Sequence, residues 1–277
     1  MRIFVCGVRG STPAPGLEFL RYGGHTSSLA LAHDGELPRL LLDAGTGIRQ
    51  VVDLLDGRPF EGSIVVTHFH WDHIMGLPFF AAGDRPGSRI DFYAPDQGDV
   101  EATLTQVMSP PHFPITPKQL RGSWHFRALQ PGPTEIEGFS VLALEVPHKG
   151  GRTYGYRISD GNATIAYISD HCPTELGAGS DGLGEYHEAA LALVEGCNLV
   201  FHDAQYTDEE LPARASFGHA SAGYAVALAQ EAGARRVLLF HHDPSRTDDQ
   251  VDALAATYSD AVVSVAGAAQ GMVIDLP

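Results

Sequence analysis

Cysteine is scarce in this sequence of 277 residues, which contains only Cys6, Cys172 and Cys197. The number is odd, and no two of them have Cys-x-x-Cys spacing. These features argue against a disulfide framework and against a cysteine-rich zinc finger. We therefore expect free, reduced thiols, which fits a cytoplasmic protein.

Long apolar runs are also absent, because no stretch reaches the roughly 18 consecutive apolar residues of a membrane-spanning helix. Residues 1–7 read directly as a strand and lack the charged and apolar segments of a secretory signal. Apolar residues still make up 44% of the chain, enough for a sizeable core. We expect a single domain over residues 1–277, without contact to a membrane.

Positive charge is in short supply. Lysine and arginine number 18 against 34 aspartates and glutamates, which gives a net charge of −16 with histidine neutral. The cations are scattered and form no basic cluster. Because non-specific binding of a nucleic acid depends on lysine and arginine, we expect a long nucleic acid to be an unlikely partner.

Short apolar runs alternate with amphipathic stretches, which predicts a layered α/β (α+β) fold. The expected strands are 3–8, 28–32, 40–43, 63–67, 90–94, 139–146, 154–158, 164–169, 199–202, 237–241 and 262–265. The expected helices are 47–55, 99–108, 186–195, 221–232 and 248–258. Thr247 is expected to cap the last helix, Gly233 to end the one before it, and the proline-dense segment 109–117 to form an irregular loop.

The run Thr67–His73 concentrates histidine and aspartate after an apolar strand. It contains His68, His70, Asp72 and His73. Imidazole and carboxylate are poor core groups but are ligands for Zn²⁺ and similar ions. His68 and His70 can point the same way from an extended chain, while Asp72 and His73 can address a second centre. The alternative is an exposed polar loop that happens to be rich in histidine.

Other polar residues directly follow apolar runs elsewhere in the chain. They are His148, Asp170, His202 with Asp203, and His241. Polar residues at strand ends are where α/β folds collect their sites. We therefore expect these segments and the first motif to share one rim. Taken singly, His148 could be a surface residue and Asp170 could cap a turn. In the pair His241-His242, either histidine could be the metal ligand.

Together these pieces resemble the metallo-β-lactamase superfamily. The matching segments, in the order of that family, are Leu41–Gly45, Thr67–His73, Pro147-His148, Ser169-Asp170 and Phe240-His241. The resemblance implies a four-layer αββα sandwich with two metal ions at one edge. It places His68, His70 and His148 on one ion, Asp72, His73 and His241 on the other, and Asp170 between them. It also makes Asp43 a carboxylate that orients the ligand loop.

Within the superfamily, two further segments resemble the ribonuclease Z-like phosphodiesterases. They are Phe217-Gly-His219-Ala-Ser and Phe201-His202-Asp203-Ala204, the latter where that branch has His-Glu-Ala-Thr. Here the acid is Asp203 and the threonine is absent. The resemblance implies that His219 protonates the leaving oxygen while Asp203 holds its ring. The alternative is a His219 without chemistry. The residues expected to act in catalysis are thus Asp72, His219 and Asp203.

The predicted function is a dinuclear metal-dependent phosphodiesterase that hydrolyses a small or cyclic phosphodiester with a hydroxide held by the metals. No long basic or glycine-rich arm for binding RNA is evident. This absence and the net charge of −16 both favour a small substrate. Lactonase, thioesterase or endoribonuclease chemistry and a non-catalytic sensor are the alternatives. Two divalent ions are expected, Zn²⁺ by default because imidazoles dominate, with Mn²⁺ or Fe²⁺ open. The resemblance also suggests a homodimer, and the roles of His25 and His112 stay open.

Overall fold

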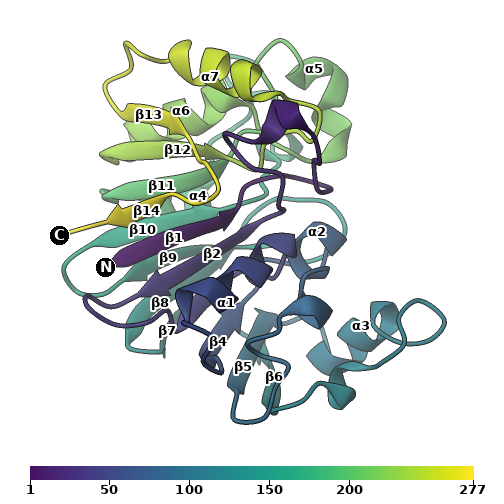
Figure 1. The fold of residues 1–277 in the computed structure, drawn as a ribbon. Coiled ribbons are helices and arrows are strands. Elements are labelled where there is room, and N and C mark those ends of the chain that lie inside the picture. The colour runs from purple at the N-terminus through teal and green to yellow at the C-terminus, as the bar shows by residue number, and fades with distance from the viewer.

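The computed structural model describes residues 1–277 as two seven-stranded sheets with helices on their outer faces (Figure 1). In spatial order, the first sheet contains β14 (Val273–Asp275), β1 (Arg2–Gly7), β2 (Ser28–Ala32), β3 (Leu40–Leu42), β4 (Glu61–Val65), β5 (Arg89–Pro95) and β6 (Ser123–Leu129). The second sheet contains β13 (Ser264–Gly267), β12 (Arg236–Phe240), β11 (Leu199–Asp203), β10 (Thr164–Ile168), β9 (Tyr154–Ser159), β8 (Phe139–Glu145) and β7 (Gly132–Ile136).

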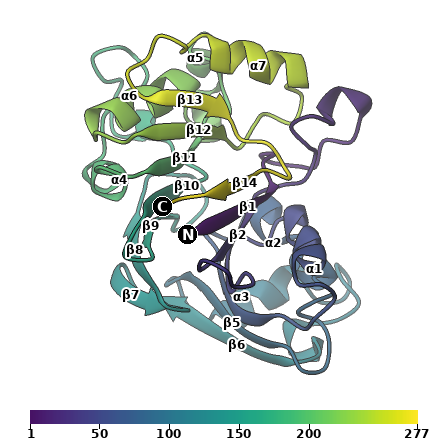
Figure 2. The same cartoon turned by 60° about the vertical axis from the view of Figure 1, so that its left-hand side comes forward.

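Three apolar clusters define the layers of the molecule. The largest joins the inner faces of the two sheets, for example Leu29 and Leu40 with Tyr167 and Phe240. A second packs the other face of β10–β12 against α4 (Glu188–Val194), α6 (Ala222–Glu231) and α7 (Asp248–Ala256). The third packs the first sheet against α1 (Val51–Leu54), α2 (Trp71–Ile74) and α3 (Val100–Val107). The order helix, sheet, sheet, helix confirms the predicted αββα sandwich, and both views follow it (Figures 1 and 2).

Local sequence signals account for several boundaries. The Thr247 side chain accepts a hydrogen bond from the backbone N–H of Gln250, so it caps α7 as predicted. Gly233 has a φ of 66° directly after α6, which glycine adopts without strain. The remaining helix is α5 (Leu211–Arg214), and single 3₁₀ turns cover Leu17–Phe19, Thr46–Gln50, Leu77–Phe79, Pro117–Gln119, Pro173–Glu175 and Ala215–Phe217.

Three strands were not predicted from the sequence, namely β6, β7 and β14. All three lie at the edge of a sheet. An edge strand has one neighbour and more contact with solvent, so its sequence need not form a continuous apolar run. In β6, for example, mostly exposed and half-buried residues alternate, and only Leu129 is buried.

Parallel pairing sets the place of the site. Strands β3 to β6 run parallel in the first sheet, and β10 to β13 run parallel in the second. The carboxyl ends of parallel strands meet at one edge of a sheet, which is where such folds place their ligands. No helix of the structure is both long and apolar enough to cross a membrane.

Candidate metal centre

The predicted ligands come together where strands of both sheets end. The first sheet contributes residues that follow β4, namely His68, His70, Asp72 and His73. The second sheet contributes one residue after each of β8, β10 and β12, namely His148, Asp170 and His241. Residues separated by up to 173 positions thus face one another across the two sheets.

Possible ligand atoms lie within 4.8 Å of one another in three groups, of which two consist of these predicted ligands and the third contains Asp170, His219 and His241. The first group contains His68, His70, His148 and Asp170, and the second contains Asp72, His73 and His241. The division matches the two ligand sets that the sequence resemblance implied.

Asp170 lies between the groups and presents one oxygen to each. Its Oδ1 is 3.0 Å from Nε2 of His73 and 3.4 Å from Nε2 of His241. Its Oδ2 is 3.5 Å from Nε2 of His148 and 3.8 Å from Nε2 of His68. A carboxylate in this position can bridge two cations.

Hydrogen bonds at Nδ1 orient two imidazoles of the second sheet. Nδ1 of His148 donates to the Gly218 carbonyl oxygen at 2.6 Å, and Nδ1 of His241 pairs with Oε1 of Gln205 at 2.9 Å. Each contact directs Nε2 toward the other ligand residues, as in metal-binding histidines whose other nitrogen is fixed: Nε2 of His148 lies 3.2 Å from Nδ1 of His70, and Nε2 of His241 lies 3.1 Å from Oδ2 of Asp72. Gln205 was not predicted, although it directly follows the segment Phe201–Ala204, because its contact with His241 arises only in the fold.

Asp43 orients the ligand loop of the first sheet. Its Oδ1 accepts a 2.7 Å hydrogen bond from the backbone N–H of Thr67, which precedes the first ligand. Its Oδ2 lies 2.8 Å from Nδ1 of His73 and accepts the Tyr167 hydroxyl at 2.7 Å. The carboxylate is fully buried, so these partners replace its solvation. This position agrees with the orienting role expected for Asp43.

Unsatisfied buried atoms test whether the residues fit a metal. Nε2 of His68 is buried without a hydrogen-bond partner, and Nε2 of His73 and Oδ1 of Asp170, which lie 3.0 Å apart, make no well-aligned hydrogen bond. Leaving such atoms unpaired costs roughly 1–3 kcal/mol each, and all three face the centre of the two groups. Nitrogen and carboxylate donors at these positions fit divalent ions. The structure therefore fits divalent metal binding.

The electrostatics of the carboxylates agree with this fit. Burial alone would raise the pKa of Asp170, but the imidazoles of His241, His73 and His68 hold the pKa of Asp170 well below its usual range. Burial also works against the charge of Asp72, and His73 and His241 likewise keep its pKa low. Both carboxylates are therefore ionised and ready to bind cations.

His219 lies beside the two groups, as the sequence suggested. Its Nδ1 is 3.0 Å from Oδ2 of Asp203 and 3.7 Å from Oδ2 of Asp170. Burial acts to lower the pKa of His219, but the carboxylates of Asp203, Asp170 and Asp72 outweigh it and raise the pKa to about 9. Asp203, which stands where the His-Glu-Ala-Thr motif has glutamate, therefore still reaches the imidazole of His219 despite its shorter side chain.

The neighbouring histidines point elsewhere. His242 turns away, with Nε2 2.8 Å from the Ala268 carbonyl oxygen, so His241 alone of this pair joins the ligand groups. His202 is buried against His171, with 3.1 Å between ring nitrogens. His25 pairs with the Thr46 hydroxyl at 3.1 Å and lies outside both groups.

The segment Gly7–Pro13 contributes backbone to the centre. The N–H of Ser11 donates to Oδ2 of Asp72 at 2.7 Å. At Gly10, an added Cβ would lie 2.4 Å from Nδ1 of His241, so only glycine fits there. These contacts depend on the fold and were not predicted.

The chain is similar to several known hydrolases. It is 27% identical over 290 residues to a ribonuclease Z of Methanosarcina acetivorans, and 90% of each chain is covered. It resembles the crystal structure of a diphosphatase from the PhnP family with a TM-score of 0.71 at 19% identity, covering 100% of this chain and 98% of that one. It also resembles human tRNase Z, short form, with a TM-score of 0.68 at 20% identity and complete coverage of both chains.

These similarities contradict the expectation that a long nucleic acid is an unlikely partner. The ribonuclease Z relative and the human tRNase Z carry RNA substrates in their names. The expectation was wrong because the net charge of −16 counts the whole chain without bound cations. Divalent ions at the buried carboxylates would reverse the local sign, and the local potential decides where a phosphate binds.

A family model described as "Beta-lactamase superfamily domain" matches residues 38–242. The match includes Asp43 and every residue of the two ligand groups, and it spans more than half of the chain. The chain therefore belongs to the metallo-β-lactamase superfamily and is a metal-dependent hydrolase.

Proposed function

We propose that this protein hydrolyses phosphodiester bonds with two divalent ions as its cofactors. The observation that carries the proposal is the buried His219–Asp203 pair beside the two ligand groups. An alkoxide leaving group needs a proton, whereas a thiolate, as in thioester hydrolysis, leaves without one. Small and cyclic phosphodiesters and RNA all present the same scissile bond, so the proposal includes them together.

A cavity of about 340 Å³ is available for the reacting phosphate. It is lined by Ser11, Phe69, His70, Trp71, Asp72, Asp170 and His219. Both the ligand groups and the proposed acid thus reach one space. When bound, two divalent ions supply Lewis acidity toward phosphoryl oxygens and acidify a water. Zn²⁺ is the proposed metal, because imidazoles dominate the ligands.

Each residue has a defined part in the proposed reaction. His68, His70 and His148 hold one ion, His73, His241 and Asp72 hold the other, and Asp170 joins them. Asp72 also orients the attacking water from its position at the cavity wall. As the bond from phosphorus to the leaving oxygen breaks, His219 gives that oxygen its proton. Asp203 stabilises the protonated ring through Nδ1.

The test is turnover by protein loaded with Zn²⁺ or Mn²⁺. Its substrates are bis(p-nitrophenyl) phosphate, a panel of cyclic nucleotides and a tRNA precursor. We expect cleavage of phosphodiesters and, for His219→Ala, a loss of about 100-fold or more with a poor leaving group. Cleavage of an ester, lactone or thioester without any phosphodiester activity would show that the proposal is wrong.

A further inference from the structure

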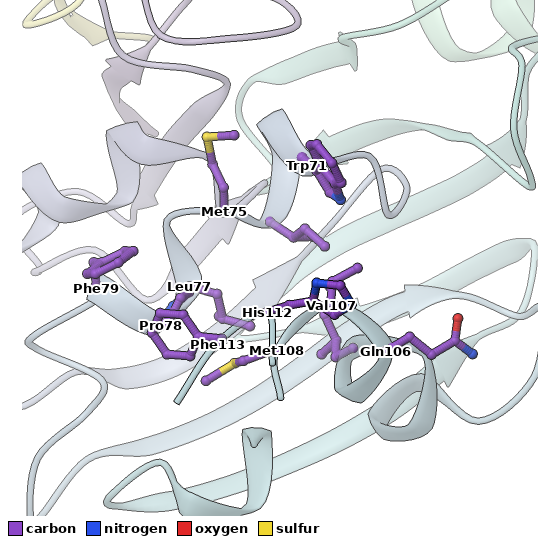
Figure 3. A pocket seen from close by; sticks show the side chains of 12 residues that line it. Trp71, Met75, Leu77, Pro78, Phe79, Gln106, Val107, Met108, His112 and Phe113 are labelled. Atoms are coloured by element: carbon purple, nitrogen blue, oxygen red, sulfur yellow. The ribbon is translucent and has the colours of Figure 1, made fainter. Parts of the chain in front are cut away.

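An apolar groove lies next to the metal centre. It has a volume of about 480 Å³ and lies between α2 with its following 3₁₀ turn and α3 with its following loop (Figure 3). Trp71, Met75 and Phe79 line it from the first segment, and Val107, Met108 and Phe113 from the second. No aspartate, glutamate, lysine or arginine is among its lining residues.

Trp71 connects this groove to the metal centre. It stands between the ligand-group residues His70 and Asp72 in the sequence, and it lines both the groove and the cavity at the centre. A ligand that occupies both the groove and the cavity would therefore pass Trp71.

Exposed apolar side chains gather along the groove. Trp71 is 69% exposed, Phe79 is 57% exposed and Val107 is 38% exposed. Water contact of large apolar groups is unfavourable, and such patches mark binding surfaces. In a chain with a net charge of −16, an uncharged aromatic strip beside a cation site suits a ligand that is anionic at one end and apolar at the other.

A second cavity also reaches the proposed acid, His219. Its lining includes His219, Tyr206, Arg214 and Phe217, and it shares no residue with the apolar groove. Because His219 protonates the leaving oxygen in the proposed reaction, the leaving group belongs in this second cavity. The groove is then left for the ester group that stays on phosphorus.

Building on the proposed function, we infer that the groove binds a planar aromatic ring on the retained side of the phosphodiester, stacked on Trp71. A nucleobase and a synthetic aryl group share the required chemistry, since both offer a flat apolar face. Trp71 is thus a residue that determines substrate preference, and it need not alter the chemical step.

Fluorescence tests the binding directly, without turnover. The chain has two tryptophans, so Trp124→Phe leaves Trp71 as the single reporter. Titration of the metal-loaded variant with adenosine 5′-monophosphate is expected to quench or shift the Trp71 emission, and inorganic phosphate alone is not. An emission that responds to neither compound, or equally to both, overturns the inference.

Kinetics test which side of the diester the groove holds. Bis(p-nitrophenyl) phosphate and ethyl p-nitrophenyl phosphate release the same leaving group and differ only in the retained one. Trp71→Ala is expected to raise KM about tenfold more for the first substrate than for the second, the order of one stacking contact. Equal effects on both substrates overturn the inference.

Two further variants complete the experiment. Phe113→Ala, on the opposite wall, is expected to give the same selective rise in KM, which separates ring binding from an effect of Trp71 on its ligand neighbours. Leu17→Ala, at a side chain that is 84% exposed and lines neither cavity, is expected to match the unmodified protein. If neither diester is cleaved, the proposed function falls, and the fluorescence result alone decides for or against the groove.

Discussion

Asp43 is the residue on which the geometry of the first ligand loop depends. Its backbone has a φ of 58°, a conformation that aspartate adopts only a few per cent of the time. The conformation turns the carboxylate back toward Thr67 and His73. Strain at one residue is thus offset by several buried hydrogen bonds around a functional centre.

Asp43→Asn is expected to weaken metal binding by about 10–100-fold, because an amide is a weaker partner for Nδ1 of His73. The measurement is competition with a chromophoric chelator at neutral pH. Tyr167→Phe is the matched control, since it removes one neutral donor from the same carboxylate and is expected to have a smaller effect. Equal losses in both variants would mean that Asp43 serves only the packing.

His242 is expected to make the fold sensitive to acid. Its complete burial, helped by Arg9 and Arg246, lowers its pKa to about 3, whereas an unfolded histidine titrates near 6.5. The folded protein therefore binds fewer protons, and the stability from neutral His242 is full above about pH 6.5 and falls as the pH drops toward 3.

His242→Gln should reduce this pH dependence by about one proton, or about 1.4 kcal/mol per pH unit, between roughly pH 6 and 4.5. Urea denaturation of the chelated protein at several pH values gives the slope for both proteins. An unchanged slope in the variant would show that His242 is protonated in the folded state.

The ligand residues were predictable because each follows an apolar strand that the sequence marks clearly. The choice between His241 and His242 was less certain, since it depends on a φ of 57° at His241 that turns the chain at the end of β12. Gln205 and Ser11 were not predictable as contacts. Their roles arise from chain segments that meet only in the folded protein.

At the scale of elements, the buried strands were predicted, and three of the four edge strands, β6, β7 and β14, were missed. The central strands β2, β9 and β10 are covered on both faces, so apolar runs define them. Helix α2 was also missed, because its four residues Trp71–Ile74 are too few for a periodic pattern. Short elements of this kind depend on tertiary contacts for their stability.

Helix α2 and the turn after β3 approach each other through glycine. The N–H of Gly76 donates to the carbonyl oxygen of Ala44 at 2.9 Å. The N–H of Ala44 donates to the carbonyl oxygen of His73 at 2.7 Å. A Cβ at Gly76 would lie 2.0 Å from the carbonyl oxygen of Gly45. Because α2 contains Asp72 and His73, any shift of this helix moves two ligands.

Gly76→Ala is therefore expected to lower stability by about 1–3 kcal/mol and also to weaken metal binding. The free energy of unfolding, measured with and without metal, separates the two effects. The steric penalty lowers it in both states, whereas the displacement of the ligands lowers it only in the metal-loaded state. Met75→Ala in the same turn, which keeps the backbone approach open, is the control. A penalty of equal size in both states would mean that the ligands do not move.

At the scale of the whole molecule, the ligand groups join the two sheets. His68, His70, Asp72 and His73 belong to the first sheet, and His148, Asp170 and His241 to the second. Bound ions would therefore link the two halves of the sandwich as well as serve in catalysis. A ligand that binds only the folded state adds stability according to its concentration above Kd.

Chelation is expected to lower the melting temperature, and Zn²⁺ at about 100 times its Kd should restore about 3 kcal/mol. His148→Ala removes a ligand of the second sheet and should shrink the difference between metal-loaded and chelated protein. His112→Ala, an exposed histidine outside both groups, should leave it unchanged. A melting temperature that does not change on chelation would exclude a stabilising role for the ions.

The order of the ligands along the chain also bears on protein synthesis. His68 to His73 are synthesised well before His241, which follows β12. A growing chain can offer an ion only part of its ligands until β12 has joined the second sheet. Tight metal capture is thus delayed until β12 has been made and packed, and chains interrupted before it hold the ion weakly and release it.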